Sequence, residues 1–406
     1  MTEHLYYHDS FLYEFDATVA SLTTVDSRPA LILDRTAFYP TSGGQVFDTG
    51  RLQASNSSPV QVVEVSENDQ GDILHFLNQP FQLAPGSTVH GEVDRDRRRD
   101  HMQQHSGQHV LSAAFIQLFN MPTVSFHMGA ESCSIDLDTK SVTADQVRAA
   151  EDLANEIVLD DRPVQIRFVT QQEAQTLGLR KIPPVERDQL RLIDIRDFDL
   201  TACGGTHVSS TGQIGSILLR KLEKVRQGWR IEFVCGKRAV ITAHHDFTTL
   251  TDAAALCSSH IWDIPQQIRK FQDEARASRK HTETLLADIA DLYAARLLSE
   301  TPEQNGRVLI VHAFPDRDLA FTKLLAQRLT RQSTKVVTLL TTTSAQPALV
   351  FAQSPGQPFD MGSLMKEALS QLGGRGGGSK DMAQGGPVQV DRIDPVLAEI
   401  ASKLHV

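Results

Sequence analysis

Three histidines spaced four residues apart restrict the fold of this chain more than any other feature. His101, His105 and His109 lie within residues 97–119, where apolar residues recur at spacings of three and four. That periodicity predicts a helix, and side chains four residues apart project from the same helix face. Two neighbouring imidazoles on that face can share one metal ion, so a complete site requires ligands from a distant part of the chain.

A second pair of candidate ligands comes much later in the sequence. Cys203 and His207 flank a Gly-Gly-Thr segment, and a glycine turn can direct a thiolate and an imidazole toward one point. Together with two helix histidines they form a donor set typical of tetrahedral zinc. Spacing alone leaves two alternatives open, a solvated polar helix face and a chance cysteine–histidine pair. Zinc peptidase chemistry is disfavoured, because Ser106 stands where HExxH enzymes have a glutamate base.

Length and composition limit the class of protein. A chain of 406 residues predicts two or three domains. The hydrophobic fraction of 40% and the charged fraction of 22% are those of a globular protein, and no apolar run approaches the roughly 18 residues of a membrane span. The N-terminus lacks the pattern of a signal peptide, and four scattered cysteines make no disulfide framework, so we expect a cytoplasmic protein with no membrane partner.

The charge pattern leaves a nucleic-acid partner open. The formal net charge of −10 argues against a basic surface over the whole chain, although a local basic face is sufficient for phosphate contacts. Cations cluster at residues 97–99 and 220–230. Such a cluster is most often a solvated face, and phosphate binding is the alternative.

The first half of the chain predicts two domains. Residues 1–92 alternate apolar and polar side chains in short runs, which indicates a small β-barrel. The glycine segment Thr41–Gln45 within it is typical of a hairpin turn. Residues 93–245 mix helical and strand patterns and carry the candidate zinc ligands, which predicts an α+β domain.

A helical linker is predicted for residues 246–304. Within it, apolar or small residues follow a heptad spacing from Ile264 to Leu292 and predict one long helix. Two alternatives for this seam stay open. It packs on the chain's own domains, or it forms a coiled coil in a homodimer through residues 264–298.

Residues 305–406 alternate short apolar strands with helical segments, which predicts a small α/β domain. This domain carries a dense glycine run from Gly373 to Gly378. Such a run is typical of a flexible linker. The cations Arg375 and Lys380 allow the alternative of a loop that holds phosphate.

Three motifs in the right order make the sequence resemble a known family. The segment His105–Leu111 looks like the HxxxH motif of the alanyl-tRNA synthetase editing domain, Asp199–His207 resembles its second zinc motif, and Thr36–Gln45 resembles its N-terminal glycine motif. The C-terminal glycine run and Asp381–Gly386 are similar to the DHH-associated domain of the same synthetases. The resemblance covers nearly the whole chain, as in the long members of the AlaX family of editing proteins.

The resemblance implies an α+β multidomain fold and a set of site residues. It places Zn²⁺ on His105, His109, Cys203 and His207, and it gives His101 no ligand role. Beside the resemblance, we expect substrate-binding roles for Gln45, Gln108, Arg375 and Lys380. Gln108 departs from the threonine usual before the second histidine. The resemblance identifies no attacking base.

The implied function is hydrolysis of mischarged tRNA(Ala) in trans, chiefly Ser-tRNA(Ala) and also Gly-tRNA(Ala). The sequence shows no aminoacylation core before the editing part, so we do not expect synthesis of aminoacyl-tRNA. Four protein ligands fill a tetrahedron, which favours a zinc ion that positions the substrate over one that carries hydroxide. The cation clusters would then contact tRNA phosphates. A tRNA-binding module with a structural zinc is the main alternative, and a metal-dependent hydrolase of small esters or amides is the third.

Overall fold

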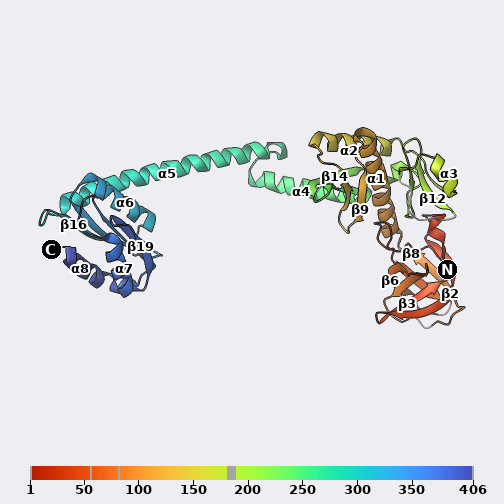
Figure 1. Cartoon of the computed structure of the whole chain (residues 1–406), viewed down its shortest axis with the longest axis horizontal. Helices are drawn as coiled ribbons and strands as arrows, with labels where there is room; N and C mark the ends of the chain where they lie inside the picture. The colour runs from red at the N-terminus through yellow and green to blue at the C-terminus, as the bar shows by residue number, and fades with distance from the viewer. Residues whose placement is uncertain (1, 55–56, 81–82, 181–188, 405–406) are drawn as a thin grey trace. The chain divides into compact units, whose positions relative to one another are not determined.

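The computed structural model describes residues 2–54, 57–80, 83–180 and 189–404. Contacts divide the chain into two compact units, Met1–Asp252 and Ala253–Val406. Both units combine helices and sheets (Figure 1), so the predicted α+β multidomain class is confirmed. The four-domain division predicted from the sequence stays a prediction.

The first unit begins with a closed six-stranded barrel, drawn in red and orange in Figure 1. Alternation explains it, because strand residues such as Val60 and Val62 point inward while Gln61 and Val63 face solvent. The barrel strands in spatial order are β2 (Glu14–Val25), β3 (Arg28–Leu33), β7 (Ile73–Leu77), β6 (Val60–Glu67), β5 (Gly50–Ala54) and β8 (Thr88–Val93). The N-terminal β1 (Glu3–His4) pairs in parallel with β4 (Arg35–Thr36).

The glycine segment between β4 and β5 forms the predicted hairpin turn. Ser42 and Gln45 exchange two backbone hydrogen bonds of 3.0 Å across it. The carbonyl of Gly44 accepts a hydrogen bond of 3.2 Å from the backbone amide of Met128, which lies in a strand beyond the barrel. The turn thus joins the barrel to the next part of the unit.

The rest of the first unit is built around one buried helix, α1 (Arg95–Phe119). The Asp94 side chain caps its first turn, and Asn120 ends it in the left-handed conformation. Every residue from His101 to Phe115 is buried. A four-stranded and a three-stranded sheet surround it with shorter helices. These elements are β9 (Thr123–Met128), β10 (Cys133–Leu137), α2 (Ala144–Leu159), β11 (Val164–Val169), α3 (Gln171–Thr176), β12 (Leu190–Ile195), β13 (Asp199–Ala202), β14 (Ile217–Val225), β15 (Gly228–Cys235) and α4 (Gly236–Leu256).

A buried ion pair fixes the start of α1 against the barrel. Arg98 and Asp48 are both 0% exposed, and Nε of Arg98 lies 3.1 and 3.0 Å from the two carboxylate oxygens. The remaining guanidinium nitrogens donate to the carbonyl oxygens of Ser10 and Ala37 at 2.9 and 2.5 Å. The prediction of a phosphate-binding face at residues 97–99 is therefore wrong for Arg98, because its guanidinium is buried and paired with Asp48.

The second cation cluster is also largely paired. Three of its cations lie against carboxylates on neighbouring elements or within their own strand, and the pairs are Arg220–Asp246, Lys221–Glu223 and Arg230–Asp136. Exposed pairs of this kind contribute little to stability. Phosphate contacts by this cluster stay a prediction.

The second unit contains α5 (Ile264–Glu300) and a five-stranded sheet, drawn in cyan to blue in Figure 1. Only β16 and β17 run parallel, so the sheet is mixed rather than the parallel sheet typical of an α/β domain. The strands in spatial order are β16 (Val308–Phe314), β17 (Val336–Thr342), β18 (Ala348–Gln353), β20 (Met382–Gly386) and β19 (Arg375–Gly378), and the other helices are α6 (Leu319–Gln332), α7 (Met361–Leu372) and α8 (Ile393–Leu404). Among the described residues, no helix is both long and apolar enough to cross a membrane.

The long helix is confirmed, but of its predicted seam only Ile264 and Ile289 are buried or packed. In the last part of α5, Ala290 and Ala294 are fully buried in a core shared with α6, while Leu292 of the seam is 72% exposed. Ile268 and Phe271, earlier in the seam, are also exposed. Packing within the chain therefore uses a neighbouring face, and a homodimer through the seam stays a prediction.

The C-terminal glycine run is neither a linker nor a loop. It forms β19, in which Gly376 pairs with Gly385 and Gly378 with Ala383 of β20. A Cβ atom on Gly376 would lie 2.3 Å from the carbonyl oxygen of Gln384, so glycine is needed for this close strand pairing. Both interpretations from the sequence are corrected here. Arg375 and Lys380 are exposed at the two ends of the segment.

We predict that Arg98→Met lowers the free energy of unfolding by about 3–5 kcal/mol, because it leaves the carboxylate of Asp48 buried without its partner. Urea unfolding followed by circular dichroism measures the change. The control is Arg51→Met, which breaks the exposed pair with Glu92 and should cost at most about 1 kcal/mol. Equal losses for the two variants would contradict a special role for the buried pair.

Candidate metal centre

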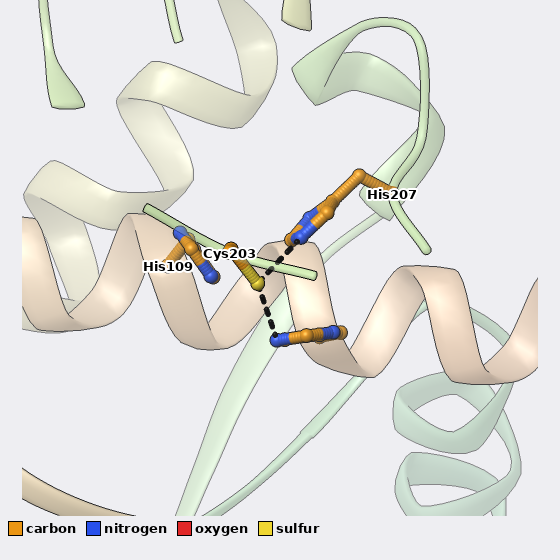
Figure 2. Close-up of side chains that lie close together, drawn as sticks. His109, Cys203 and His207 are labelled. Carbon is orange, nitrogen blue, oxygen red and sulfur yellow. Dashed lines mark hydrogen bonds between the residues drawn. The ribbon is translucent and has the colours of Figure 1, made fainter. Parts of the chain in front are cut away.

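Four side chains from two distant segments meet inside the first unit. His105 and His109 project from α1, while Cys203 and His207 lie on the loop that follows β13. One donor atom from each lies within 4.8 Å of the others, and Figure 2 shows His109, Cys203 and His207 pointing toward one another. His101 is not part of this cluster. The structure brings together the four residues that the sequence motifs selected.

The distances within the cluster fit a tetrahedral metal ion. Sγ of Cys203 lies 3.5 Å from Nε2 of His105 and 3.4 Å from Nε2 of His207. Zinc binds thiolates at about 2.3 Å and imidazoles at about 2.0 Å, so a tetrahedral arrangement separates these two donors by about 3.5 Å. The donor set of one thiolate and three imidazoles is also one that zinc prefers. The residues therefore fit zinc in both chemistry and spacing.

The glycine turn of the barrel orients one of the imidazoles. The Oε1 atom of Gln45 accepts a hydrogen bond of 2.8 Å from Nδ1 of His105 and one of 3.1 Å from the backbone amide of Thr206. A donor at Nδ1 keeps the lone pair on Nε2, the atom that faces Cys203. A Cβ atom on Gly205 would lie 2.1 Å from Cε1 of His105, which explains the glycine in the second motif.

The other two imidazoles have oxygen partners as well. Nδ1 of His207 lies 3.0 Å from Oγ of Ser106, and Nδ1 of His109 lies 3.4 Å from a carboxylate oxygen of Asp199. Asp199 in turn pairs with Arg180 at 3.0 Å. Such outer contacts hold metal-binding imidazoles in one orientation and one tautomer.

The electrostatics of the cluster favour a thiolate. Burial alone would raise the pKa of Cys203, but the neighbouring imidazoles outweigh it and hold that pKa well below its ordinary value. Burial lowers the pKa of His207, and the charge on His105 lowers it further. Burial opposes a charge on His109 as well, but Cys203 and Asp199 raise its pKa. The thiolate is the form of cysteine that binds metal ions.

A cavity of about 740 Å³ opens directly beside the cluster. It is much larger than an amino-acid side chain, so it has room for more of a substrate than the acyl group alone. The lining residues are Gly43, His105, Gln108, His109, Ile116, Pro122, Thr123, Val124, Ser125, Phe126, Arg180, Thr201, Ala202, Cys203 and Gly204.

Gln108 belongs to a buried polar chain along this cavity. Its Nε2 donates to Oγ of Ser112 at 2.8 Å, and that hydroxyl lies 2.7 Å from Oγ1 of Thr123. Gln108 is therefore a buried residue that lines the cavity, not a solvated one. A polar chain of this kind can recognise a hydroxyl or amino group of a bound molecule.

Gln45, another predicted substrate-binding residue, is not among the residues that line the cavity. Gln45 is buried behind the cluster and uses both ends of its amide on His105 and Thr206. Arg375 and Lys380 belong to the second unit. The structure therefore gives Gln45 the role of orienting a ligand, and binding by the two cations stays a prediction.

Sequence reasoning missed three residues of the site. Ser106 and Arg180 are among the polar partners described above, and the ring of Phe126 stacks on His105 with centroids 5.5 Å apart. Ser106 carried a signal, because it stands between two candidate ligands in the helix motif. No sequence signal pointed to Arg180 or Phe126, because their position in the site depends on how distant segments pack.

Family models match three parts of the chain. Residues 3–97 match the class II (A) tRNA synthetases, residues 190–232 match the second additional domain of threonyl and alanyl tRNA synthetases, and residues 310–405 match the DHHA1 domain. The second match contains two of the four cluster residues, Cys203 and His207. Together the fold, the cluster and these matches define a protein of the synthetase editing class.

Similar proteins narrow this class. The alanyl-tRNA editing protein AlaX-L of Pyrococcus horikoshii is 30% identical over 100% of both chains. The alanine–tRNA ligase of Thermococcus kodakarensis is 33% identical over 99% of this chain and 44% of its own length. The C-Ala domain of the Aquifex aeolicus alanyl-tRNA synthetase covers 26% of this chain with a TM-score of 0.25 and 20% identity. The chain belongs to the AlaX-L family of alanyl-tRNA editing proteins.

We predict that the purified protein holds one zinc ion per chain and that a Cys203→Ala/His207→Ala variant loses it, because two of the four donors are gone. Inductively coupled plasma mass spectrometry gives the metal content. His101→Ala is the control on the same helix face and should keep its zinc. Full zinc occupancy in the double variant would overturn the ligand assignment.

Proposed function

We propose that this protein is an aminoacyl-tRNA deacylase that hydrolyses mischarged tRNA(Ala), chiefly Ser-tRNA(Ala) and also Gly-tRNA(Ala). One observation carries the proposal: three residues of a four-residue, zinc-type cluster line a cavity that also holds polar and apolar groups. Family membership supports it, since a relative matched over its full length is named as an alanyl-tRNA editing protein.

Zinc bound at the cluster would supply a positive charge that orients the amino acid of the substrate. It would be held by His105, His109, Cys203 and His207. Because these four residues complete a tetrahedral site, no coordination position on the ion is left for hydroxide. The other residues of the site have supporting roles. They hold the imidazoles in one orientation through hydrogen bonds, line the cavity and limit the water that reaches the ester.

Serine is distinguished from alanine by a single hydroxyl. A site that hydrogen-bonds this hydroxyl disfavours the analogue that lacks it, because its own polar groups are then left unpaired. The amide of Gln108 stands in the cavity next to the ligand His109, and the polar chain behind it, through Ser112, holds its position. We assign recognition of the serine hydroxyl to Gln108.

We predict that the unmodified protein hydrolyses Ser-tRNA(Ala) much faster than Ala-tRNA(Ala), and that Gln108→Leu reduces this ratio at least about tenfold without loss of zinc. Deacylation of the two substrates, measured side by side with labelled amino acids, gives the ratio. Gln117→Leu, at an exposed position of the same helix, is the control and should keep the ratio. Equal hydrolysis of both substrates by the unmodified protein would exclude a proofreader of this kind.

Two additions to this assay separate the alternatives: a measurement of Ser-tRNA(Ala) binding, and free amino-acid esters as a third substrate. A tRNA-binding module with a structural zinc binds Ser-tRNA(Ala) without turnover. A hydrolase of small molecules turns over free amino-acid esters without tRNA.

The second unit is proposed to supply affinity for tRNA. Arg375 and Lys380 are exposed on one short hairpin and have no ion pair among the described residues of the chain. Cations in such positions contact phosphates without reading the sequence.

A homodimer through residues 264–298 is proposed from the exposed part of the α5 seam, with Ile268 and Phe271 as contact residues.

We predict that Arg375→Ala/Lys380→Ala raises the KM for Ser-tRNA(Ala) and lowers the salt dependence of binding by about one unit per lost contact, while kcat and zinc content stay the same. Filter binding at several salt concentrations measures this slope. Lys403→Ala, which removes a cation paired with Glu367 and Glu399, is the control. An unchanged slope in the double variant would contradict the assignment.

A further inference from the structure

Arg180 is the one permanently charged side chain among the residues that line the described cavity. It was not selected by any sequence motif. Its side chain is 18% exposed, and Nη2 lies 3.4 Å from Nδ1 of the cluster residue His109. A guanidinium therefore lines the cavity beside the cluster, where the ester of an aminoacyl-tRNA would react.

The orientation of this guanidinium is fixed from one side. Nε lies 3.0 Å from Oδ1 of Asp199, and Nη2 donates to Oδ2 of the same carboxylate at 3.1 Å. Nε also donates to Oγ1 of Thr201 at 2.9 Å, and the backbone amide of Arg180 donates to the carbonyl of Leu200. A two-point pair of this kind holds the planar group in one geometry.

Nη1 has no hydrogen-bond partner in the part of the chain that the structure describes. Among the described residues its two N–H groups are therefore unused, and Arg180 lines the cavity. Fixed donors in a partly dry cavity stabilise negative charge more strongly than the same donors in water.

We propose that Arg180 is a catalytic residue that donates from Nη1 to the carbonyl oxygen of the aminoacyl ester as negative charge develops on it. The inference rests on the proposed function. Water adds to the carbonyl carbon, and the π electrons of the C=O bond move to oxygen. When this oxyanion collapses, the bond from the carbon to the ribose oxygen breaks. The ribose oxygen takes one proton of the water, and the other passes to solvent from the released amino acid.

An oxyanion is a better match for Arg180 than a phosphate of the tRNA. The guanidinium lies against His109 and lines the cavity beside the metal cluster. The phosphodiester of the terminal nucleotide is separated from the ester by the ribose ring, so it lies farther from the reacting carbon. A phosphate contact would be formed equally in the ground state and would affect KM rather than kcat.

The test compares full-length, zinc-loaded proteins in steady-state deacylation of Ser-tRNA(Ala). Arg180→Met should lower kcat about 10²-fold with KM and zinc content nearly unchanged. Arg167→Met is the matched control, because it also removes an arginine paired with an aspartate, Asp194 at 2.8 Å, across the neighbouring strands β11 and β12. This pair does not line the cavity, so the variant should keep kcat.

A second variant tests whether a loss of kcat comes from the missing donor or from the carboxylate of Asp199 that is left without its partner. Arg180→Met/Asp199→Asn removes the carboxylate that the single variant leaves unpaired, and it should stay slow per bound zinc. Recovery of kcat in the double variant, loss of zinc in the single variant, or a rise in KM alone would each overturn the proposal. An unmodified protein that binds Ser-tRNA(Ala) without hydrolysing it would instead refute the proposed function.

Discussion

The buried pair of Arg98 and Asp48 is the interaction on which the first unit depends. Taking two charges out of water is costly, and the pair is tolerable because further hydrogen bonds surround both partners. Asp48 also accepts from the backbone amide of Tyr39 at 2.7 Å, and Arg98 reaches the carbonyl of Ser10. Ser10 accepts in turn from the backbone amide of His207 through its hydroxyl. One salt bridge thus links the barrel, α1 and the loop that carries the second pair of cluster residues.

This linkage gives the barrel a part in the chemistry of the site. The barrel contributes no cluster residue and does little to line the cavity, yet its glycine turn places Gln45 behind His105 and Thr206. A metal-binding imidazole needs a partner at its second nitrogen, and the length of a glutamine fits the space left by Gly205. The barrel and the α1 domain are therefore one functional unit, even though the sequence predicts them as two domains.

The sequence could predict the parts of the site that depend on local geometry. Helical spacing is sufficient to place His105 and His109 on one face, and a glycine turn is sufficient to bring Cys203 near His207. It could not predict Arg98 as buried, since three consecutive arginines are typical of a solvated face and only the position of Asp48 reverses this. The glycine run after Gly373 was misjudged for a different reason, because composition suggests a flexible segment and does not show that the run pairs with β20 in a short hairpin.

A fully protein-bound metal shifts the catalytic task to side chains. If the four cluster residues complete a tetrahedral site, the ion can attract and orient an amino acid. It then has no open coordination position for an attacking hydroxide. Stabilisation of the charge that develops on the ester must then come from fixed donors that the substrate meets beside the ion. In the described cavity, Arg180 offers a charged donor and Gln108 a neutral one. Their different chemistry suits a division of labour in which the charged group serves the reaction and the neutral group serves the choice of substrate.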